Sequence, residues 1–165
     1  MWQEAASMAA RLHQGQFRKD GRTPYVAHCW RVAMTIRHVF GCADEPTIAA
    51  ALLHDLIEDT TADYDEIAEA LGAEVADLVA AMTKNMALPE SEREREYDRR
   101  LAAADWRARL IKLADTLDNL SEAGAAERAR AAEKARRAIA LARTDAATHA
   151  ESRAGVEAIE RLLAG

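Results

Sequence analysis

The 165-residue sequence contains little of what interrupts or crosslinks a chain: three prolines, seven glycines, two cysteines and only 5% aromatic residues. Because proline and glycine mark turns, their scarcity argues against many short strands and favours long helices. Cys29 and Cys42 provide neither a disulfide framework nor the spacing of a zinc site. We therefore expect two reduced thiols and a cytoplasmic protein.

Long apolar runs are also missing. No stretch reaches the roughly 18 apolar residues of a transmembrane helix, and the N-terminal residues do not resemble a signal peptide. The formal net charge of −6 argues against a nucleic-acid-binding domain, because such domains usually carry a basic surface. We expect neither a membrane nor a nucleic acid as a partner.

Basic residues are absent from one part of the chain. Between His38 and Thr83 there is no lysine or arginine, yet eleven acidic residues occur there. Such carboxylates either face solvent or are balanced by something that the chain does not encode, such as a metal ion.

Apolar residues recur at helical spacing along nearly the whole chain, which predicts a single all-α domain, residues 1–165. Its core would span about 13–122, followed by Ala-rich C-terminal helices over 126–163. Thr23 and Pro24 resemble an N-cap followed by proline at the first helical position. The predicted helices, within a bundle of about eight to ten, cover residues 2–14, 23–40, 46–58, 63–71, 73–83, 90–103, 104–122, 126–143 and 145–163.

The predicted helix over 46–58 carries a conflict. It is apolar on most faces, as expected of the buried centre of a domain. Yet its last turn holds His54, Asp55, Glu58 and Asp59, which are rarely buried unless something pairs or coordinates them. Positions four residues apart share a helix face, so these side chains converge. Histidine and carboxylate ligands together suit Mn, Fe, Zn or Mg-like ions.

A complete metal site needs ligands from elsewhere in the chain. His28 on the preceding long helix and Asp115 in an otherwise apolar helix are the candidates. Taken alone, His28 is better explained as a core histidine, and Asp115 is equally explained as a polar position of an amphipathic helix. Their order and separation relative to His54 and Asp55 favour the metal interpretation.

These residues resemble the ordered H…HD…D signature of the HD-domain metal-dependent phosphohydrolases. The closer resemblance is to the hydrolase domain of the bacterial Rel/Spo alarmone enzymes and to small alarmone hydrolases. Residues 54–60, His-Asp-Leu-Ile-Glu-Asp-Thr, resemble the family's most specific block, H-D-x-x-E-D-T. Residues 21–28, ending Pro-Tyr-Val-Ala-His, and residues 112–119, beginning Lys-Leu-Ala-Asp and ending in Asn119, resemble two further blocks.

The resemblance implies a compact HD-domain bundle and an enzyme. The implied reaction is Mn²⁺-dependent removal of the 3′-pyrophosphate from guanosine tetra- or pentaphosphate, which releases pyrophosphate and GDP or GTP. It also implies the residues that act: one Mn²⁺ ion per chain held by His28, His54, Asp55 and Asp115, with Glu58 as the principal proton-handling residue and Asp59 in support.

Substrate-binding residues follow from the same resemblance. Arg18 would stack on the base, because a guanidinium plane suits that task. Lys19 would face base or phosphate, Asn119 would contact the sugar, and Tyr25 would line the pocket. Without the other blocks, Arg18 and Lys19 would be interpreted as a solvated basic loop.

The chain departs from the family pattern at four places, one of which is Arg22 and Thr23, where the family often has Glu before Pro and Tyr. Thr116 and Asp118 stand where the family usually has a basic residue and an aromatic residue or histidine, and Cys29 replaces a common proline. These departures keep an alternative substrate open, an adenosine 3′-pyrophosphate or a nucleoside monophosphate.

Two non-enzymatic alternatives also stay open at this point. The chain is either a nucleotide-binding module without turnover, or its Ala-rich helices serve as the interface of a homo-oligomer. The basic run between Arg128 and Arg143 is interpreted as a solvated face, and Lys84 with the arginines of 93–100 as groups that reach phosphates.

Overall fold

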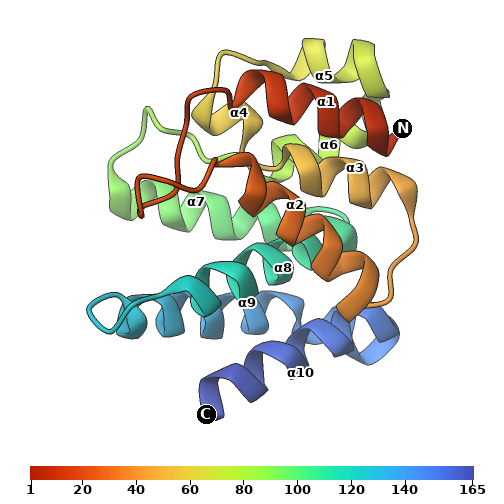
Figure 1. The fold of residues 1–165 in the computed structure, drawn as a ribbon. Coiled ribbons are helices and arrows are strands. Elements are labelled where there is room, and N and C mark those ends of the chain that lie inside the picture. The colour runs from red at the N-terminus through yellow and green to blue at the C-terminus, as the bar shows by residue number, and fades with distance from the viewer.

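The computed structural model describes residues 1–165, and the chain forms ten α-helices, one π-helical turn and no strand (Figure 1). The predicted all-α class is therefore confirmed. The helices are α1 (Trp2–Leu12), α2 (Val26–Met34), α3 (Glu45–Leu53), α4 (Leu56–Asp59), α5 (Tyr64–Leu71), α6 (Ala73–Met82), α7 (Glu90–Ala103), α8 (Trp106–Glu122), α9 (Arg128–Thr148) and α10 (Ala150–Ala164), and the π-helical turn η1 (Thr35–Val39) follows α2.

Helix α3 is the buried centre of the fold. Asp44 caps its N-terminus, where the side chain accepts a hydrogen bond from the backbone N–H of Thr47 at 3.0 Å. Every residue from Thr47 to Leu53 is buried, and the helix packs against α1, α2, α6 and α8. An apolar helix surrounded on several sides matches the prediction from its hydrophobic surface.

Helix α3 ends at Leu53, with His54 as its C-cap, so the predicted continuous helix over 46–58 is wrong. Asp55 adopts φ −99° and ψ 1°, after which the chain resumes as the single turn α4. This break between α3 and α4 lies at the polar residues of the proposed metal site. The apolar pattern continues through it, which is why periodicity alone did not reveal it.

Three further boundaries differ from the predictions, and one of them is the start of α10, which lies at Ala150 and not at 145. Helix α2 begins at Val26, because Pro24 forms an isolated antiparallel bridge with Phe17 in place of opening the helix. Helix α9 continues to Thr148, beyond the predicted end at 143. Asp145 is held there by an ion pair with Arg109 of α8, at 2.5 Å between Oδ2 and Nε, and no glycine or proline marks an earlier end.

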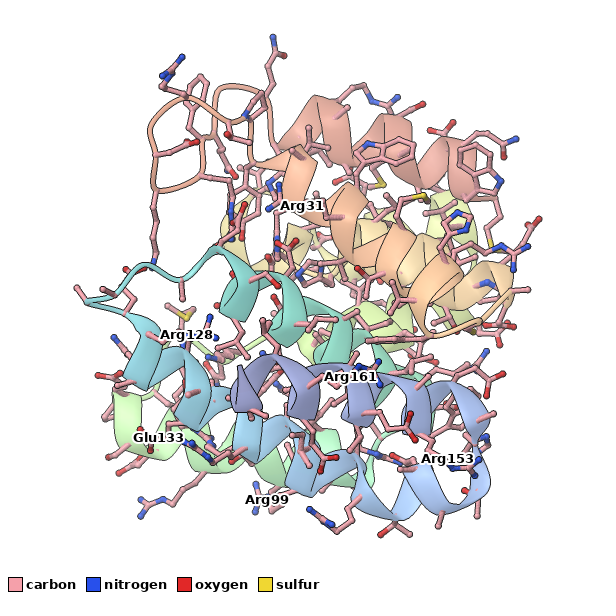
Figure 2. The ribbon with its side chains drawn as sticks, turned by 60° about the horizontal axis from the view of Figure 1, so that its bottom comes forward. Arg31, Arg99, Arg128, Glu133, Arg153 and Arg161 are labelled. Carbon is pink, nitrogen blue, oxygen red and sulfur yellow. The ribbon has the colours of Figure 1, made fainter.

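The C-terminal helices close one side of the core (Figure 1). Helix α10 approaches α8 closely at Gly155, where an added Cβ would meet Leu113 Cδ1 at 3.0 Å. Charged side chains of the α9–α10 face, including Arg153 and Arg161, project outward (Figure 2). None of the helices combines the length and apolar character that crossing a membrane requires.

Candidate active site

His54 ends α3 with one ring nitrogen fixed by the backbone. Its Nδ1–H donates to the carbonyl of Ala51 at 2.9 Å, which turns Nε2 away from the helix. That Nε2 is buried, has no hydrogen-bond partner, and lies 3.1 Å from Asp55 Oδ2 and 3.7 Å from Asp115 Oδ1. A buried imidazole nitrogen surrounded by carboxylates is suited to hold a cation.

His28 of α2 is arranged in the same way. Its Nδ1–H donates to Asp118 Oδ2 at 2.6 Å, while Nε2 lies 3.3 Å from Asp115 Oδ1 and 3.7 Å from Asp55 Oδ2. Both histidines therefore use Nδ1 for an anchor and present Nε2 to the same two carboxylates. In metal sites an outer hydrogen bond of this kind fixes the tautomer and the ring orientation.

The four residues predicted as ligands thus lie together. One ligand atom each from His28, His54 and Asp115 falls within 4.8 Å of the others. Asp55 lies beside both rings, and its Oδ2 accepts a hydrogen bond from the hydroxyl of Tyr25 at 2.6 Å. Two imidazole nitrogens and two carboxylate oxygens form a donor set that suits a divalent transition metal.

Electrostatics keep the carboxylates ionised. Burial raises the pKa of Asp115, but the neighbouring Lys112 and His28 outweigh it and hold that pKa well below its ordinary value. Burial also raises the pKa of Asp55, but the neighbouring His54 outweighs it, so the pKa of Asp55 is lowered. Both side chains are therefore available as anionic ligands.

Glu58 and Asp59 of α4 lie beside this group. Glu58 Oε2 accepts a hydrogen bond from the backbone N–H of Lys84 at 3.0 Å, which directs the carboxylate into the pocket. Burial, with repulsion from Asp55, raises the pKa of Glu58 and that of Asp59 above the ordinary carboxylate value. A raised pKa makes a carboxylate a better proton acceptor.

The loop between α1 and α2 carries Arg18 to the opposite wall. Its guanidinium donates to Asn119 Oδ1 at 2.8 Å and to Glu122 Oε2 at 2.7 Å, and lies 5.5 Å from the centre of the Tyr25 ring. Asn119 Nδ2 in turn donates to Asp115 Oδ1 at 2.6 Å. The predicted nucleotide-binding residues are therefore linked to the candidate metal ligands.

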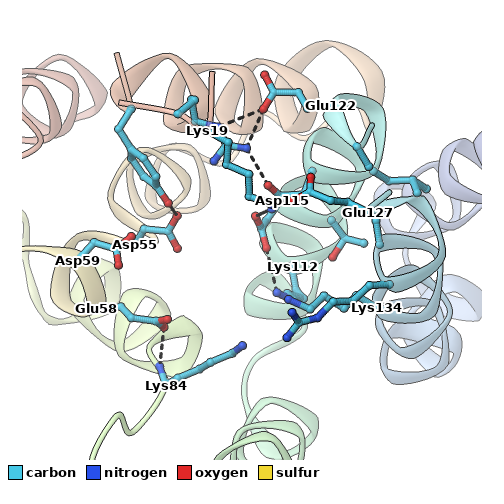
Figure 3. Close-up of a pocket in the computed structure, with 18 of the residues that line it drawn as sticks. Lys19, Asp55, Glu58, Asp59, Lys84, Lys112, Asp115, Glu122, Glu127 and Lys134 are labelled. Atoms are coloured by element: carbon cyan, nitrogen blue, oxygen red, sulfur yellow. Dashed lines mark hydrogen bonds and ion pairs between the residues drawn. The ribbon is translucent and has the colours of Figure 1, made fainter. Parts of the chain in front are cut away.

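A single pocket of about 810 Å³ joins these groups (Figure 3). His28 and His54 lie buried beneath it. Lys84 lines the pocket, whereas the arginines between 93 and 100 do not. The remaining residues predicted from the sequence all line it: Arg18, Lys19, Tyr25, Asp55, Glu58, Asp59, Asp115 and Asn119.

The sequence interpretation missed four charged residues. In the sequence Asp118 is only a departure from the family pattern, yet in the structure it anchors His28 and accepts two hydrogen bonds from Arg31. Arg130 and Lys134 are exposed, as the solvated-face interpretation predicts, but both also line the pocket. Their spacing of four residues on one helix was a signal, but it does not tell which face α9 turns inward.

Residues 5–163 match the model of the HD domain family, and the chain belongs to that family. The guanosine-3′,5′-bis(diphosphate) 3′-pyrophosphohydrolase MESH1 of Drosophila melanogaster is 43% identical over 121 residues, which cover 72% of this chain and 67% of that protein. A GTP pyrophosphokinase of Myxococcus xanthus is 40% identical over 129 residues, 69% of this chain and 17% of its own length. The solved structure of a metazoan ortholog of SpoT that hydrolyzes ppGpp is similar with a TM-score of 0.83 and 32% identity, covering 97% of this chain and 93% of the other.

Proposed function

We propose that this chain is a Mn²⁺-dependent hydrolase that removes the 3′-pyrophosphate from guanosine tetra- and pentaphosphate, releasing pyrophosphate and GDP or GTP. One observation carries the proposal: two imidazole nitrogens and two carboxylates converge beneath a pocket whose walls hold Glu58 and Arg18. The names of the MESH1 relatives, and the description of the SpoT ortholog, support the substrate class.

We propose that His28, His54, Asp55 and Asp115 hold the divalent ion that an HD domain implies, and that this ion is Mn²⁺. The buried Nε2 of His54, which no protein group satisfies, supports this assignment. When bound, such an ion makes water more acidic and neutralises charge on a phosphoryl group.

Glu58 is proposed to move the proton of the attacking water. The water oxygen forms a bond to the phosphorus attached to the ribose 3′-oxygen, and the bond between that phosphorus and the 3′-oxygen breaks. The proton that Glu58 accepts from water passes to the ribose oxygen, and pyrophosphate leaves. The raised pKa of Glu58 supports this role, with Asp59 as the supporting carboxylate.

Arg18, Tyr25 and Asn119 are proposed to bind the nucleoside. The guanidinium plane of Arg18 stacks on the base next to Tyr25, and Asn119 contacts the ribose. The hydrogen bonds from Arg18 to Asn119 and from Asn119 to Asp115 support a continuous path from base to reaction centre. Lys19, which pairs with Glu127 at 2.6 Å and lines the same pocket, is proposed to face base or phosphate.

Purified protein loaded with Mn²⁺ tests the proposal. We expect pyrophosphate and GDP from guanosine 3′,5′-bis(diphosphate), with loss of release in His54→Ala and Asp55→Ala. Arg143→Gln, an exposed change on α9 outside the pocket, serves as the matched control and keeps wild-type activity.

Failure of well-metallated protein to release pyrophosphate would overturn the substrate assignment. Parallel assays with adenosine 3′-pyrophosphates and nucleoside monophosphates identify the alternative base or phosphate pattern. Binding of nucleotide by calorimetry without any product would indicate a binding module in place of an enzyme.

We also propose that residues 1–165 act as one domain. A single core cluster of 37 buried residues includes members from α1 through α10. Because the pocket is lined by residues from Arg18 to Lys134, the C-terminal helices belong to the same functional unit as the motif-bearing part.

A further inference from the structure

Three lysines from distant parts of the chain gather on one wall of the pocket. Lys84 follows α6, Lys112 belongs to α8 and Lys134 to α9, and all three line the cavity (Figure 3). The ammonium groups of Lys84 and Lys112 lie 5.4 and 5.6 Å from the centre of the buried Tyr97 ring. One aromatic side chain therefore supports two cations of this wall.

The opposite wall is already neutralised by the protein. Arg18 forms an ion pair with Glu122 at 2.7 Å, and Lys19 forms one with Glu127 at 2.6 Å. Although the family resemblance implies that these two cations bind base and phosphate, each already has a carboxylate partner. This wall, formed by Arg18 and Lys19, therefore has little unpaired positive charge with which to bind an anionic group of the substrate.

The lysine wall is less well neutralised. Lys84 has one carboxylate partner, Glu94, at 2.8 Å, and Lys112 has Asp115 at 2.9 Å. Lys134 forms no ion pair and no side-chain hydrogen bond, although it lines the pocket together with these cations. Burial, together with repulsion from Lys84 and Lys112, lowers the pKa of Lys134.

Like charges held together in a pocket raise the free energy of the folded protein unless a counter-charge binds there. Glu94 pairs with Lys84, and Asp115, a candidate metal ligand, pairs with Lys112. The unmatched charge lies at Lys134, with Lys84 next to it. A phosphate group, with several anionic oxygens, is the ligand that such a cluster recognises.

We infer that Lys84 and Lys134 form a subsite for the diphosphate of the substrate that is not cleaved, the one on the ribose 5′-oxygen. The inference rests on the proposed function. The scissile 3′-diphosphate belongs at the candidate metal ligands beside Lys112, and the base belongs at Arg18. The wall formed by Lys84 and Lys134 is then the cationic surface left for the second diphosphate, and Arg130 of α9 extends it outward.

The subsite sets specificity. A nucleotide with phosphates on both the 3′- and the 5′-oxygen of the ribose contacts the candidate metal ligands and the two lysines together. A nucleotide without the 5′-phosphates contacts only the candidate metal ligands. Because each tenfold change in affinity corresponds to about 1.4 kcal/mol, one charge-assisted contact suffices to discriminate between them.

Two substrates that differ only in the 5′-diphosphate test this subsite: guanosine 3′,5′-bis(diphosphate) and guanosine 3′-diphosphate. For the first substrate we expect Lys134→Gln and Lys84→Gln to raise KM about tenfold, and kcat of Lys134→Gln, whose side chain does not act on Glu58, to change less than about twofold. For the second substrate we expect KM to stay at the wild-type value. Lys134→Arg, which keeps the charge, is expected to restore wild-type KM.

Arg136→Gln is the matched control, because Arg136 is an exposed cation of the same helix that does not line the pocket. An equal rise of KM for both substrates overturns the inference by assigning the lysines to the scissile group. An unchanged KM in both lysine variants also overturns it, while the proposed function stands.

If wild-type protein hydrolyses neither substrate, the proposed function fails and calorimetry with GDP and guanosine tests the subsite separately. Tighter binding of GDP to wild type, lost in Lys134→Gln but kept in Arg136→Gln, supports the subsite. Equal binding of GDP to wild type and Lys134→Gln overturns it.

Discussion

Asp118 Oδ2 lies 2.6 Å from Nδ1 of His28, and the same carboxylate accepts two hydrogen bonds from Arg31. Burial opposes ionisation of Asp118, but His28 and Arg31 lower its pKa to about 2. The carboxylate is therefore ionised at neutral pH and holds the imidazole with Nε2 facing Asp55 and Asp115. An acidic residue at this departure from the family pattern thus has a structural role beside the candidate ligand.

Replacing Asp118 by asparagine keeps the size of the side chain but removes its charge and one of the two oxygens that serve His28 and Arg31. We expect Asp118→Asn to weaken Mn²⁺ affinity by about 10- to 100-fold, the usual effect of losing an outer hydrogen-bond partner of a ligating histidine. Calorimetric titration of metal-free protein measures the change. Glu133→Gln, an exposed carboxylate on α9, is the control, and equal Mn²⁺ affinity in both variants would contradict the role of Asp118.

Mn²⁺ should stabilise the fold, because its proposed ligands come from three separate segments. At a free concentration of one hundred times Kd, an ion that binds only folded protein adds about 2.7 kcal/mol to the free energy of unfolding. We expect the melting temperature to rise by several degrees with Mn²⁺, and His54→Ala to abolish the rise. A shift of equal size in His54→Ala would place the ion elsewhere.

We expect ionised Glu58 to lower the free energy of unfolding and to support catalysis. Its folded-state pKa is raised, so ionisation at neutral pH disfavours the folded protein; this destabilisation disappears as pH falls below the ordinary glutamate pKa. We expect Glu58→Gln to melt at a higher temperature near pH 7 and to lose about 100- to 10,000-fold in kcat. The melting difference should vanish in acid, and a lower melting temperature at pH 7 would contradict the assignment.

The same carboxylate predicts the acid side of the activity profile. Because Glu58 must be ionised to accept a proton, kcat should fall as pH drops through its raised pKa. Initial rates with saturating Mn²⁺ between pH 4 and pH 9, compared with Asp59→Asn, measure this limb. A profile that stays flat down to the ordinary glutamate pKa, about 4.3, would exclude Glu58 as the proton acceptor.

The contact of α10 with α8 should not tolerate a larger side chain at Gly155. An added Cβ already meets Leu113 at 3.0 Å and the Phe40 ring at 3.2 Å. We expect Gly155→Leu to destabilise the protein by about 1–3 kcal/mol, the usual cost of overpacking. Denaturant unfolding measures this, with Gly124→Ala as the control because nothing lies within 4 Å of its added Cβ.

Helices with clear boundary signals were predictable from the sequence. Asp63 accepts a hydrogen bond from the N–H of Glu66 and starts α5 where the sequence indicated, and α7 covers the predicted residues 90–103. The ligand candidates were also predictable, because the adjacent His54 and Asp55 conflict with an apolar helix. Local pattern carries this information since capping and periodicity act within a few residues.

Long-range pairings were not predictable in the same way. His28 and Asp118 are 90 residues apart, and nothing local indicates that their side chains meet. The break after His54 was hidden because apolar residues continue on both sides of it. Likewise, Lys134 shares a basic helix with the exposed Arg136, and only the packing of α9 decides which cation faces the pocket.

The ion pairs from Arg18 to Glu122 and from Lys19 to Glu127 join positions more than 100 residues apart. Contacts of such high sequence separation form late, because the long intervening chain must first be ordered. During synthesis, a chain that has emerged only as far as Asp115 therefore contains every proposed metal ligand. It does not yet contain Lys134, and neither of the two ion pairs can form. Because α9 supplies part of the pocket lining, the complete pocket requires the C-terminal part of the chain and cannot form on the motif-bearing part alone.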